Sequence, residues 1–207
     1  MNQAVLDLEK AIKEDKPGLM RKFAEKINEI FFKDPNHLPI EQILKTDLIE
    51  ILIEFLKKQN SGSGSHIREF LRVLVNITSA KGSSVIEKLV DLDIIKIASG
   101  FAQHEDFLIR ENALIVLANI AGENMEFRDQ IIEEESEKIL QAILSEDKDR
   151  IPVSFWTDLS WFLGVLFRDS PSQHFELVSQ FLLKVSLIIN SLVDSFCSYY
   201  PRASLEI

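Results

Sequence analysis

Two asparagines interrupt long apolar stretches of this 207-residue chain and bring hydrogen-bonding groups into them. Asn76 follows Leu-Arg-Val-Leu-Val, and Asn119 follows Ala-Leu-Ile-Val-Leu-Ala. Asparagine has a poor helix propensity, but its amide supplies two donors and one acceptor to whatever lies against it. These amides either bond or cap locally within the chain, or bind a partner. Their recurrence at matching places favours a partner.

The side chains that could perform catalysis are not grouped in the sequence. Four histidines are scattered without the paired spacing of a metal site. The single cysteine, Cys197, has no candidate base nearby, and no glycine-rich phosphate loop is present. One cysteine also excludes an internal disulfide and indicates a reducing compartment. We therefore expect a protein that is not an enzyme and that holds no metal or cofactor.

The asparagines belong to a pattern that repeats along the chain. They lie 43 residues apart, and Val165 takes the corresponding place 46 residues further on. A second apolar and acidic landmark recurs in phase. Its copies begin at residues 43, 89 and 131. Helical repeats of roughly 40–47 residues are the signature of armadillo and HEAT solenoids.

The composition agrees with an all-α chain. Glycine and proline are scarce, at 7 and 6 residues, and no long alternating strand pattern occurs. We expect a single solenoid domain over residues 1–207. Its predicted repeats cover residues 3–58, 66–101, 105–144 and 150–192, followed by an irregular tail at 193–207. Residues 60–65, Asn-Ser-Gly-Ser-Gly-Ser, predict a loop between repeats, native or engineered.

The charge of the chain limits its partners. The net charge is −10, from 23 basic and 33 acidic residues, which disfavours phosphate binding and hence nucleic acid. It favours basic partners, although soluble helical proteins are often acidic. No apolar run reaches the ~18–20 residues that a membrane span needs, and the N-terminus lacks the features of a signal peptide.

The segment from Asn119 onward resembles a known family. It reads Asn-Ile-Ala-Gly, then Glu123, and after a short interval Arg128-Asp129. This is similar to the third armadillo repeat of importin-α, the family of adaptors that bind nuclear localisation signals. We expect Gly122 to end one helix and Arg128-Asp129 to begin the next element. Weaker matches lie at residues 39–49, 104–106 and 110–111, so that the resemblance spans roughly residues 39–169.

The resemblance implies an all-α, right-handed superhelical armadillo solenoid of about four repeats, as a truncated or divergent member of the family. In that family one helix of each repeat lines a concave groove with a tryptophan and, about one turn later, an asparagine. Residues one turn apart point the same way. The asparagine can hold the backbone of an extended peptide, and the ring can wall a slot for a lysine or arginine stem, with cation–π attraction of ~0.5–2 kcal/mol.

Carried over position by position, the resemblance implies a peptide-binding set with several replacements. Arg72 and Ile115 stand where the second and third repeats carry tryptophan. The fourth repeat keeps its ring as Trp161 but has Val165 at the asparagine position, and Glu123 replaces an aspartate. The implied peptide-binding residues are Arg72, Asn76, Ile115, Asn119, Glu123 and Trp161. At least one of Phe162 and Leu163, beside Trp161, is expected in the core.

The functional expectation is an adaptor that binds basic nuclear localisation signal peptides for import, acting in cytoplasm and nucleus. The resemblance implies importin-β as a further partner, although residues 1–10 contain one lysine and no basic cluster. Neither nucleic acid nor membrane is expected as a partner. The alternative is an armadillo scaffold that binds another protein and has lost signal recognition. Arg72, Ile115 and Val165 favour it, because they make the groove less polar and less selective for lysine.

Overall fold

The computed structural model describes residues 1–32, 39–59, 64–80, 84–144 and 151–168, together with Leu183 and Ser186. These residues form α-helices joined by turns, and no strand occurs among them. The helices are α1 (Asn2–Lys13), α2 (Pro17–Phe32), α3 (Ile40–Leu44), α4 (Leu48–Lys58), α5 (Ser65–Thr78), α6 (Ser84–Asp91), α7 (Ile94–Phe101), α8 (Phe107–Ala121), α9 (Met125–Glu134), α10 (Ser136–Leu144) and α11 (Val153–Phe167). The all-α prediction is confirmed.

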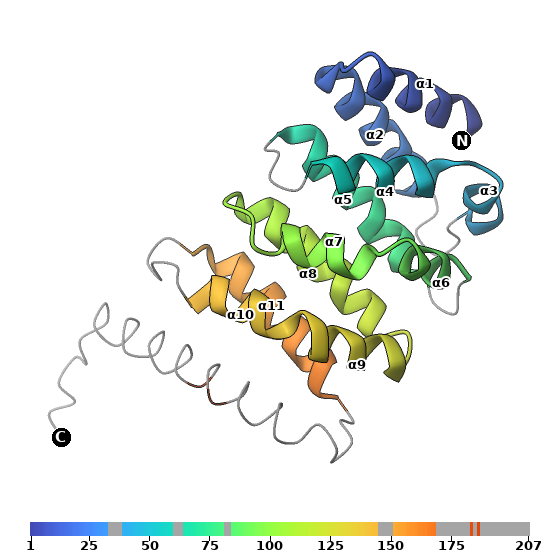
Figure 1. Ribbon diagram of the computed structural model, residues 1–207. Helices are drawn as coiled ribbons and strands as arrows, with labels where there is room; N and C mark the ends of the chain where they lie inside the picture. The colour runs from blue at the N-terminus through green and yellow to red at the C-terminus, as the bar shows by residue number, and fades with distance from the viewer. Residues whose placement is uncertain are drawn as a thin grey trace, which may run out of the picture.

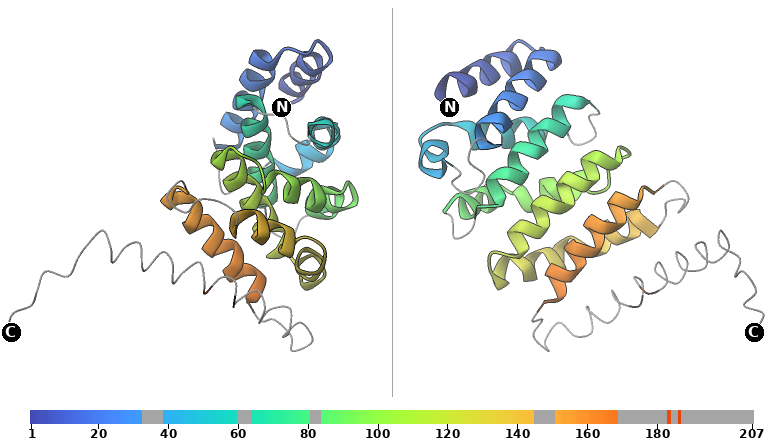
Figure 2. Two further views of the ribbon diagram at one scale, coloured as in Figure 1. Left: turned by 60° about the vertical axis from the view of Figure 1, so that its left-hand side comes forward. Right: turned by 180° about the vertical axis from the view of Figure 1, so that it is seen from behind.

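The helices stack in two layers. We call α2, α5, α8 and α11 the inner helices; they lie side by side, and each packs against the next (Figure 2, right). Helices α1, α4, α7 and α10, the outer helices, form a second row over them, and α3, α6 and α9, the edge helices, gather at one edge (Figure 1). The order edge, outer, inner recurs in α3–α5, α6–α8 and α9–α11. This arrangement confirms the predicted α-solenoid.

The expected repeat ranges after the first start on an inner helix, whereas the first range, 3–58, starts in α1. Residues 66–101 correspond closely to α5–α7, and residues 105–144 to α8–α10. A periodic array can be counted from any of its helices, so this division stays a prediction, as does the right-handed superhelix. Much of the range 150–192, and the whole tail 193–207, lie outside the described residues.

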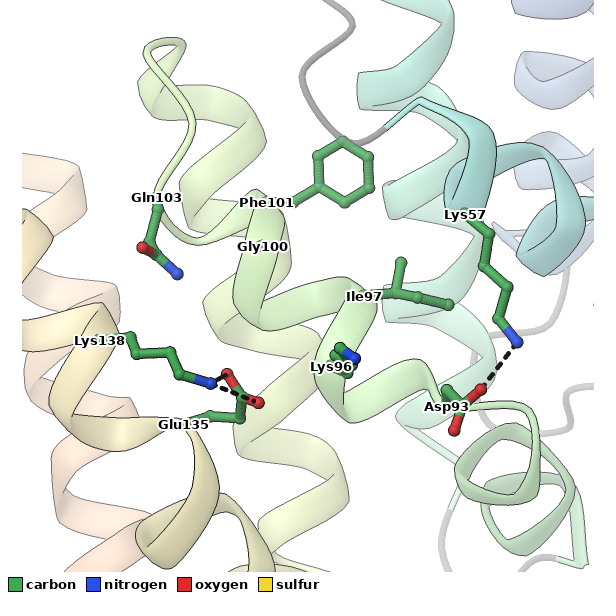
Figure 3. A pocket seen from close by; sticks show the side chains of 9 residues that line it. All are labelled: Lys57, Asp93, Lys96, Ile97, Gly100, Phe101, Gln103, Glu135 and Lys138. Atoms are coloured by element: carbon green, nitrogen blue, oxygen red, sulfur yellow. Dashed lines mark hydrogen bonds and ion pairs between the residues drawn. The ribbon is translucent and has the colours of Figure 1, made fainter.

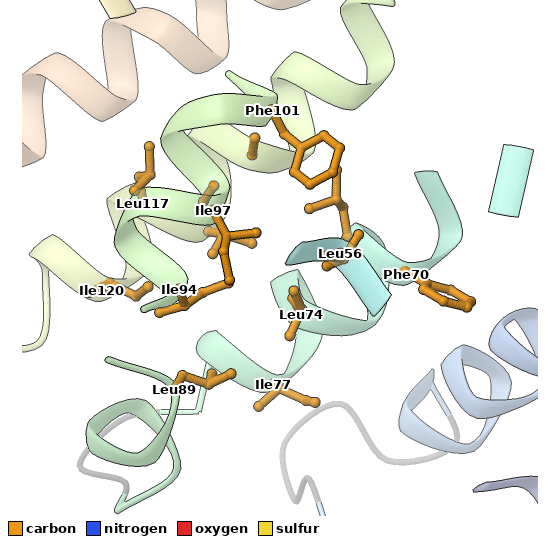
Figure 4. Close-up of a cluster of buried hydrophobic side chains, with 14 of the residues drawn as sticks. Leu56, Phe70, Leu74, Ile77, Leu89, Ile94, Ile97, Phe101, Leu117 and Ile120 are labelled. Atoms are coloured by element: carbon orange, nitrogen blue, oxygen red, sulfur yellow. The ribbon is translucent and has the colours of Figure 1, made fainter. Parts of the chain in front are cut away.

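A continuous apolar core joins the layers. Leu56 of α4, Leu74 of α5, Ile97 of α7 and Leu117 of α8 converge in its centre (Figure 4). The prediction for the fourth inner helix is confirmed, because Phe162 and Leu163 are both buried. In such an array each repeat is stabilised by contact with its neighbours, since a single repeat has too little apolar surface of its own to bury.

Local signals set the helix ends. Helix α8 ends before Gly122, as predicted. The expectation that Arg128-Asp129 begins the next element is wrong by one turn, because α9 starts at Met125. The reason is the preceding cap: the side chain of Asn124 accepts a hydrogen bond from the backbone N–H of Phe127 at 2.9 Å.

Phe162 tests the dependence on stacking. Its side chain is completely buried in α11, so Phe162→Ala is expected to lower the free energy of unfolding by about 3–5 kcal/mol. Urea denaturation followed by circular dichroism measures the change. Ser160→Ala on the exposed face of the same helix is the control and should shift stability by no more than about 0.5 kcal/mol. Equal effects of the two substitutions would contradict the packing of α11.

A second prediction concerns His66. Its ring centroid lies 5.8 Å from that of Phe55 and 6.3 Å from that of Phe70. Burial lowers the pKa of His66 from its ordinary value of 6.5, against a weaker opposing effect of Asp15. The unfolded chain therefore binds a proton more readily than the folded one. The stability that the neutral His66 ring contributes is fully present above the unfolded-state pKa, and it is lost as the pH falls through the folded-state pKa.

Denaturation at a series of pH values from about 7.5 to 5.5 follows this loss, around the ordinary histidine pKa. His66→Phe, which keeps an aromatic ring without a titrating group, should lose less stability over the same interval. Asp158, whose pKa is raised by burial and by Glu111, acts in the opposite sense. It is common to both proteins, so the difference between them reports His66. Identical pH profiles of the two proteins would contradict a lowered pKa of His66.

Candidate functional site

The inner helices carry a row of asparagines that the solenoid brings side by side. Asn28 of α2, Asn76 of α5 and Asn119 of α8 form this asparagine row. Nδ2 of Asn76 donates to Oδ1 of Asn28 at 2.9 Å. Nδ2 of Asn119 donates to Oγ1 of Thr78 at 3.0 Å and approaches the carbonyl oxygen of Val75 at 3.4 Å. Each amide therefore bridges two neighbouring inner helices.

These bridges combine the two interpretations of the asparagines. The amide N–H groups bond within the chain, but to the preceding repeat and not to their own helix. Asn76 and Asn119 are only half-buried. Within the part of the chain that the structure describes, their Oδ1 atoms have no hydrogen-bond donor. Asn76 and Asn119 are thus held in place by their N–H groups and can still accept a hydrogen bond from the backbone of a partner.

Asn28 was not identified from the sequence. It is almost fully buried, at 3% exposure, and precedes Asn76 by 48 residues. The available signal was a polar residue inside the apolar series of α2. That signal is weak, because the interval exceeds the 43 residues between Asn76 and Asn119.

Three of the six predicted residues meet in one hollow between α8 and α11. We call it the inner hollow; its volume is about 460 Å³. Asn119 and Glu123 lie on the α8 side, and Trp161 on the α11 side, where its side chain is 45% exposed. The full lining is Thr78, Ser79, Ala118, Asn119, Gly122, Glu123, Trp161, Val165 and Arg168.

The inner hollow combines an apolar wall with polar groups. Val165 and the Trp161 ring supply apolar surface on α11, while Glu123 and Arg168 carry opposite charges. At Gly122, a Cβ atom would lie 3.3 Å from the carbonyl oxygen of Ala118 in its own helix, and 3.8 Å from Cγ1 of Val165, an ordinary van der Waals contact with α11. Such a hollow suits a side chain with an aliphatic stem and a polar end.

Arg72, Asn76 and Ile115 lie outside the lining of the inner hollow. Ile115 is half-buried one turn before Asn119 on the same helix. Arg72 is held by Glu69: its Nη1 atom lies 3.1 Å from Oε1 and 3.0 Å from Oε2 of that carboxylate. Arg72 is therefore paired within the chain, a feature that the sequence pattern did not indicate.

Two carboxylates, Glu111 on α8 and Asp158 on α11, interact through their charges. Glu111 is buried and accepts a hydrogen bond from Ser154 Oγ at 2.5 Å. Burial raises the pKa of Asp158, and the negative charge of Glu111 raises it further. Glu111 lies two turns before Asn119, and Asp158 one turn before Trp161.

A second hollow, of about 540 Å³, lies over the outer helices α4, α7 and α10. Figure 3 shows its two ion pairs, Lys57 with Asp93 at 2.9 Å and Lys138 with Glu135 at 3.2 Å. None of the six predicted residues lines it. It is a surface separate from the asparagine row.

The described residues form neither a metal-binding cluster nor a membrane-spanning helix. They contain no cluster of three or more histidine, cysteine or acidic side chains placed to hold a metal ion. Among the same residues, no helix is both long enough and apolar enough to cross a bilayer. Cys197 lies outside the described part of the chain.

Comparison with known sequences finds relatives among the importins. The chain is 23% identical over 177 residues to importin subunit alpha-5 of Arabidopsis thaliana, covering 86% of this chain and 33% of the relative. It is 26% identical over 156 residues to importin subunit alpha-1b of Oryza sativa subsp. japonica, covering 74% and 28%. The chain thus spans about a third of the length of these curated relatives. No family model matches it.

Solved structures share its fold. An engineered protein matches with a TM-score of 0.69 at 21% identity, over 87% of this chain and 69% of that one. A designed armadillo repeat protein, solved in complex with the peptide (KR)4, matches with a TM-score of 0.64 at 18% identity, over 86% and 68%. The chain thus has the fold of an armadillo-repeat solenoid and resembles importin alpha subunits in sequence.

Proposed function

We propose that this chain binds a basic peptide of the nuclear localisation signal type along its inner helices, as an importin-α-like adaptor. The observation that carries the proposal is the convergence of Asn119, Glu123 and Trp161 on the inner hollow. Two relatives are importin alpha subunits, and a designed armadillo neighbour was solved with a peptide of alternating lysine and arginine. These likenesses support the proposed ligand class.

Each of the three residues has a separate task in this proposal. The Asn119 amide, anchored by Thr78, accepts a hydrogen bond from the peptide backbone through Oδ1. The exposed ring of Trp161 packs against the aliphatic stem of a lysine and attracts its ammonium group. Glu123 supplies negative charge at the same hollow. The acidic chain, with its net charge of −10, attracts a basic ligand over a longer range.

The wider cellular role follows from the same proposal. A chain that binds nuclear localisation signals works in the cytoplasm and the nucleus, delivering its cargo for import. Importin-β is the second partner in this scheme. The proposal involves neither catalysis nor a cofactor, and neither nucleic acid nor membrane as a partner.

The second candidate is a scaffold that binds an uncharged segment of another protein. Val165 is the observation that favours it, because an aliphatic side chain borders the inner hollow where a second amide would otherwise bind peptide backbone. Ile115 and the paired Arg72 also favour binding of an uncharged segment. A stable partner, recovered by pull-down and retained by Asn76→Ala and Asn119→Ala, would support this candidate over the first.

Asn119→Ala tests the adaptor. The substitution removes Oδ1, which accepts from the peptide backbone, and the amide bridge to Thr78. Binding of a fluorescein-labelled lysine-rich signal peptide should therefore weaken by about 1–2 kcal/mol, or roughly 5- to 30-fold. Fluorescence anisotropy at low salt measures the dissociation constant.

Gln141→Ala is the matched control, because it removes an exposed amide from the outer helix α10. It should leave the dissociation constant unchanged. Absence of peptide binding by the unsubstituted chain would exclude the adaptor. An equal response to both substitutions would remove Asn119 from the binding site.

Trp161 and Glu123 separate the ring contribution from the charge contribution. Trp161→Ala should weaken binding by about 0.5–2 kcal/mol at both low and high salt, because stem packing and cation–π attraction are short-range. Glu123→Gln should weaken binding mainly at low salt, because added salt screens charge attraction beyond ~8 Å at physiological ionic strength. The same salt series by anisotropy compares the two variants. Matching salt profiles would contradict this division of tasks.

A further inference from the structure

The face of the solenoid formed by the inner helices is the proposed binding groove. Its end at α2 and α5 contains a buried carboxylate. Glu69 of α5 is only 7% exposed, although it lies next to the asparagine row. Asn28 Nδ2 lies 3.2 Å from its Oε2 atom, and Asn76 in turn donates to Asn28. Glu69 is therefore held in position by the same amides that bridge the inner helices. A charged carboxylate at such low exposure needs a cation beside it.

The chain supplies that cation from its own helix. Arg72 lies one turn beyond Glu69 and approaches both carboxylate oxygens, at 3.1 and 3.0 Å. The Arg72 side chain remains 43% exposed and that of Glu69 only 9%, so Arg72 is the solvent-facing partner of the pair. Glu69 therefore accepts a hydrogen bond from the Asn28 amide and pairs with the Arg72 guanidinium, which takes the place that another cation could fill.

Other nearby cations are paired elsewhere. Arg21 of α2 bonds Glu25 at 2.7 Å, and Arg68 of α5 bonds Asp106 at 2.8 Å. The charge of Arg21 also acts on Glu69 from α2, but it is Arg72 that hydrogen-bonds the Glu69 carboxylate directly. The two ends of the groove therefore differ: Arg72 covers the acid near α2 and α5, whereas the exposed Trp161 ring lies open at α8 and α11.

We propose that Glu69 is a cation subsite of the groove and that Arg72 occupies it in place of a ligand side chain, so that this end of the groove accepts an uncharged peptide residue. This inference rests on the proposed function, which it deepens. It makes Arg72 a specificity-determining residue. The bound peptide would carry its basic residue at the inner hollow and uncharged residues over α5.

Vacating the site is the direct test. Arg72→Met keeps most of the aliphatic stem and removes the guanidinium, which leaves Glu69 open to a ligand cation. Two labelled extended peptides serve as probes: one with a single central lysine among alanines, and one with lysines throughout. Their dissociation constants are measured by fluorescence anisotropy on the whole chain, in the unsubstituted protein, Arg72→Met, Glu69→Gln and the double variant.

The ratio of the two dissociation constants is the readout. Arg72→Met should tighten binding of the all-lysine peptide by about tenfold or more, as expected for one added hydrogen bond to a charged group. It should leave the single-lysine peptide nearly unchanged. The gain should vanish in the double variant, because the glutamine side chain carries no charge, and should fall as salt is raised. Circular dichroism verifies that each variant is folded, and Arg72→Ala replaces Arg72→Met if the latter is not.

Each outcome decides the inference separately from the proposed function. An unchanged ratio in Arg72→Met, or a gain that persists in the double variant, would overturn the cation subsite. If the unsubstituted chain binds neither peptide, the proposed function fails. The subsite would then still be supported by Arg72→Met binding only the all-lysine peptide in a manner dependent on Glu69. It would be overturned by Arg72→Met binding neither peptide.

Discussion

The side-by-side packing of the inner helices is the constraint on which the rest of this structure depends. A repeat in a solenoid has too little apolar surface to form a core alone and is stabilised by its neighbours. Here α2 packs on α5, α5 on α8, and α8 on α11. Any polar side chain at these contacts must find its partner on the adjacent helix, since an unpaired buried polar group costs ~1–3 kcal/mol.

The asparagine row follows from that constraint. The Asn76 amide bonds Asn28 one repeat earlier, and the Asn119 amide bonds Thr78 one repeat earlier. These bonds orient the amides and reduce the number of conformations that a ligand would have to restrict. The same contacts thus link the packing of neighbouring repeats to the preorganisation of a binding surface, which favours affinity by lowering the entropy lost on binding.

The two ends of the groove differ in how their charges are paired. At α2 and α5, Glu69 is buried and paired with Arg72. Between α8 and α11, the exposed Trp161 ring and Glu123 line the same hollow, and burial together with the charge of Glu111 raises the pKa of Asp158. A groove built from similar repeats therefore presents different chemistry along its length, because single substitutions such as Arg72 and Val165 act locally.

The sequence by itself determined the helices and their period. Helix formation depends on periodic apolar residues and on near neighbours, so the end of α8 at Gly122 was predictable, while the cap Asn124 moved the start of α9 away from Arg128. The tertiary structure decided which side chains meet. Asn28 and Asn76 bond across 48 residues and Asn119 and Thr78 across 41, and such partners depend on how the repeats stack. Periodicity placed Arg72 and Trp161 at equivalent positions, and helix spacing paired Arg72 with Glu69 three residues earlier. Only stacking buried that carboxylate against α2 and left the Trp161 ring open at the inner hollow.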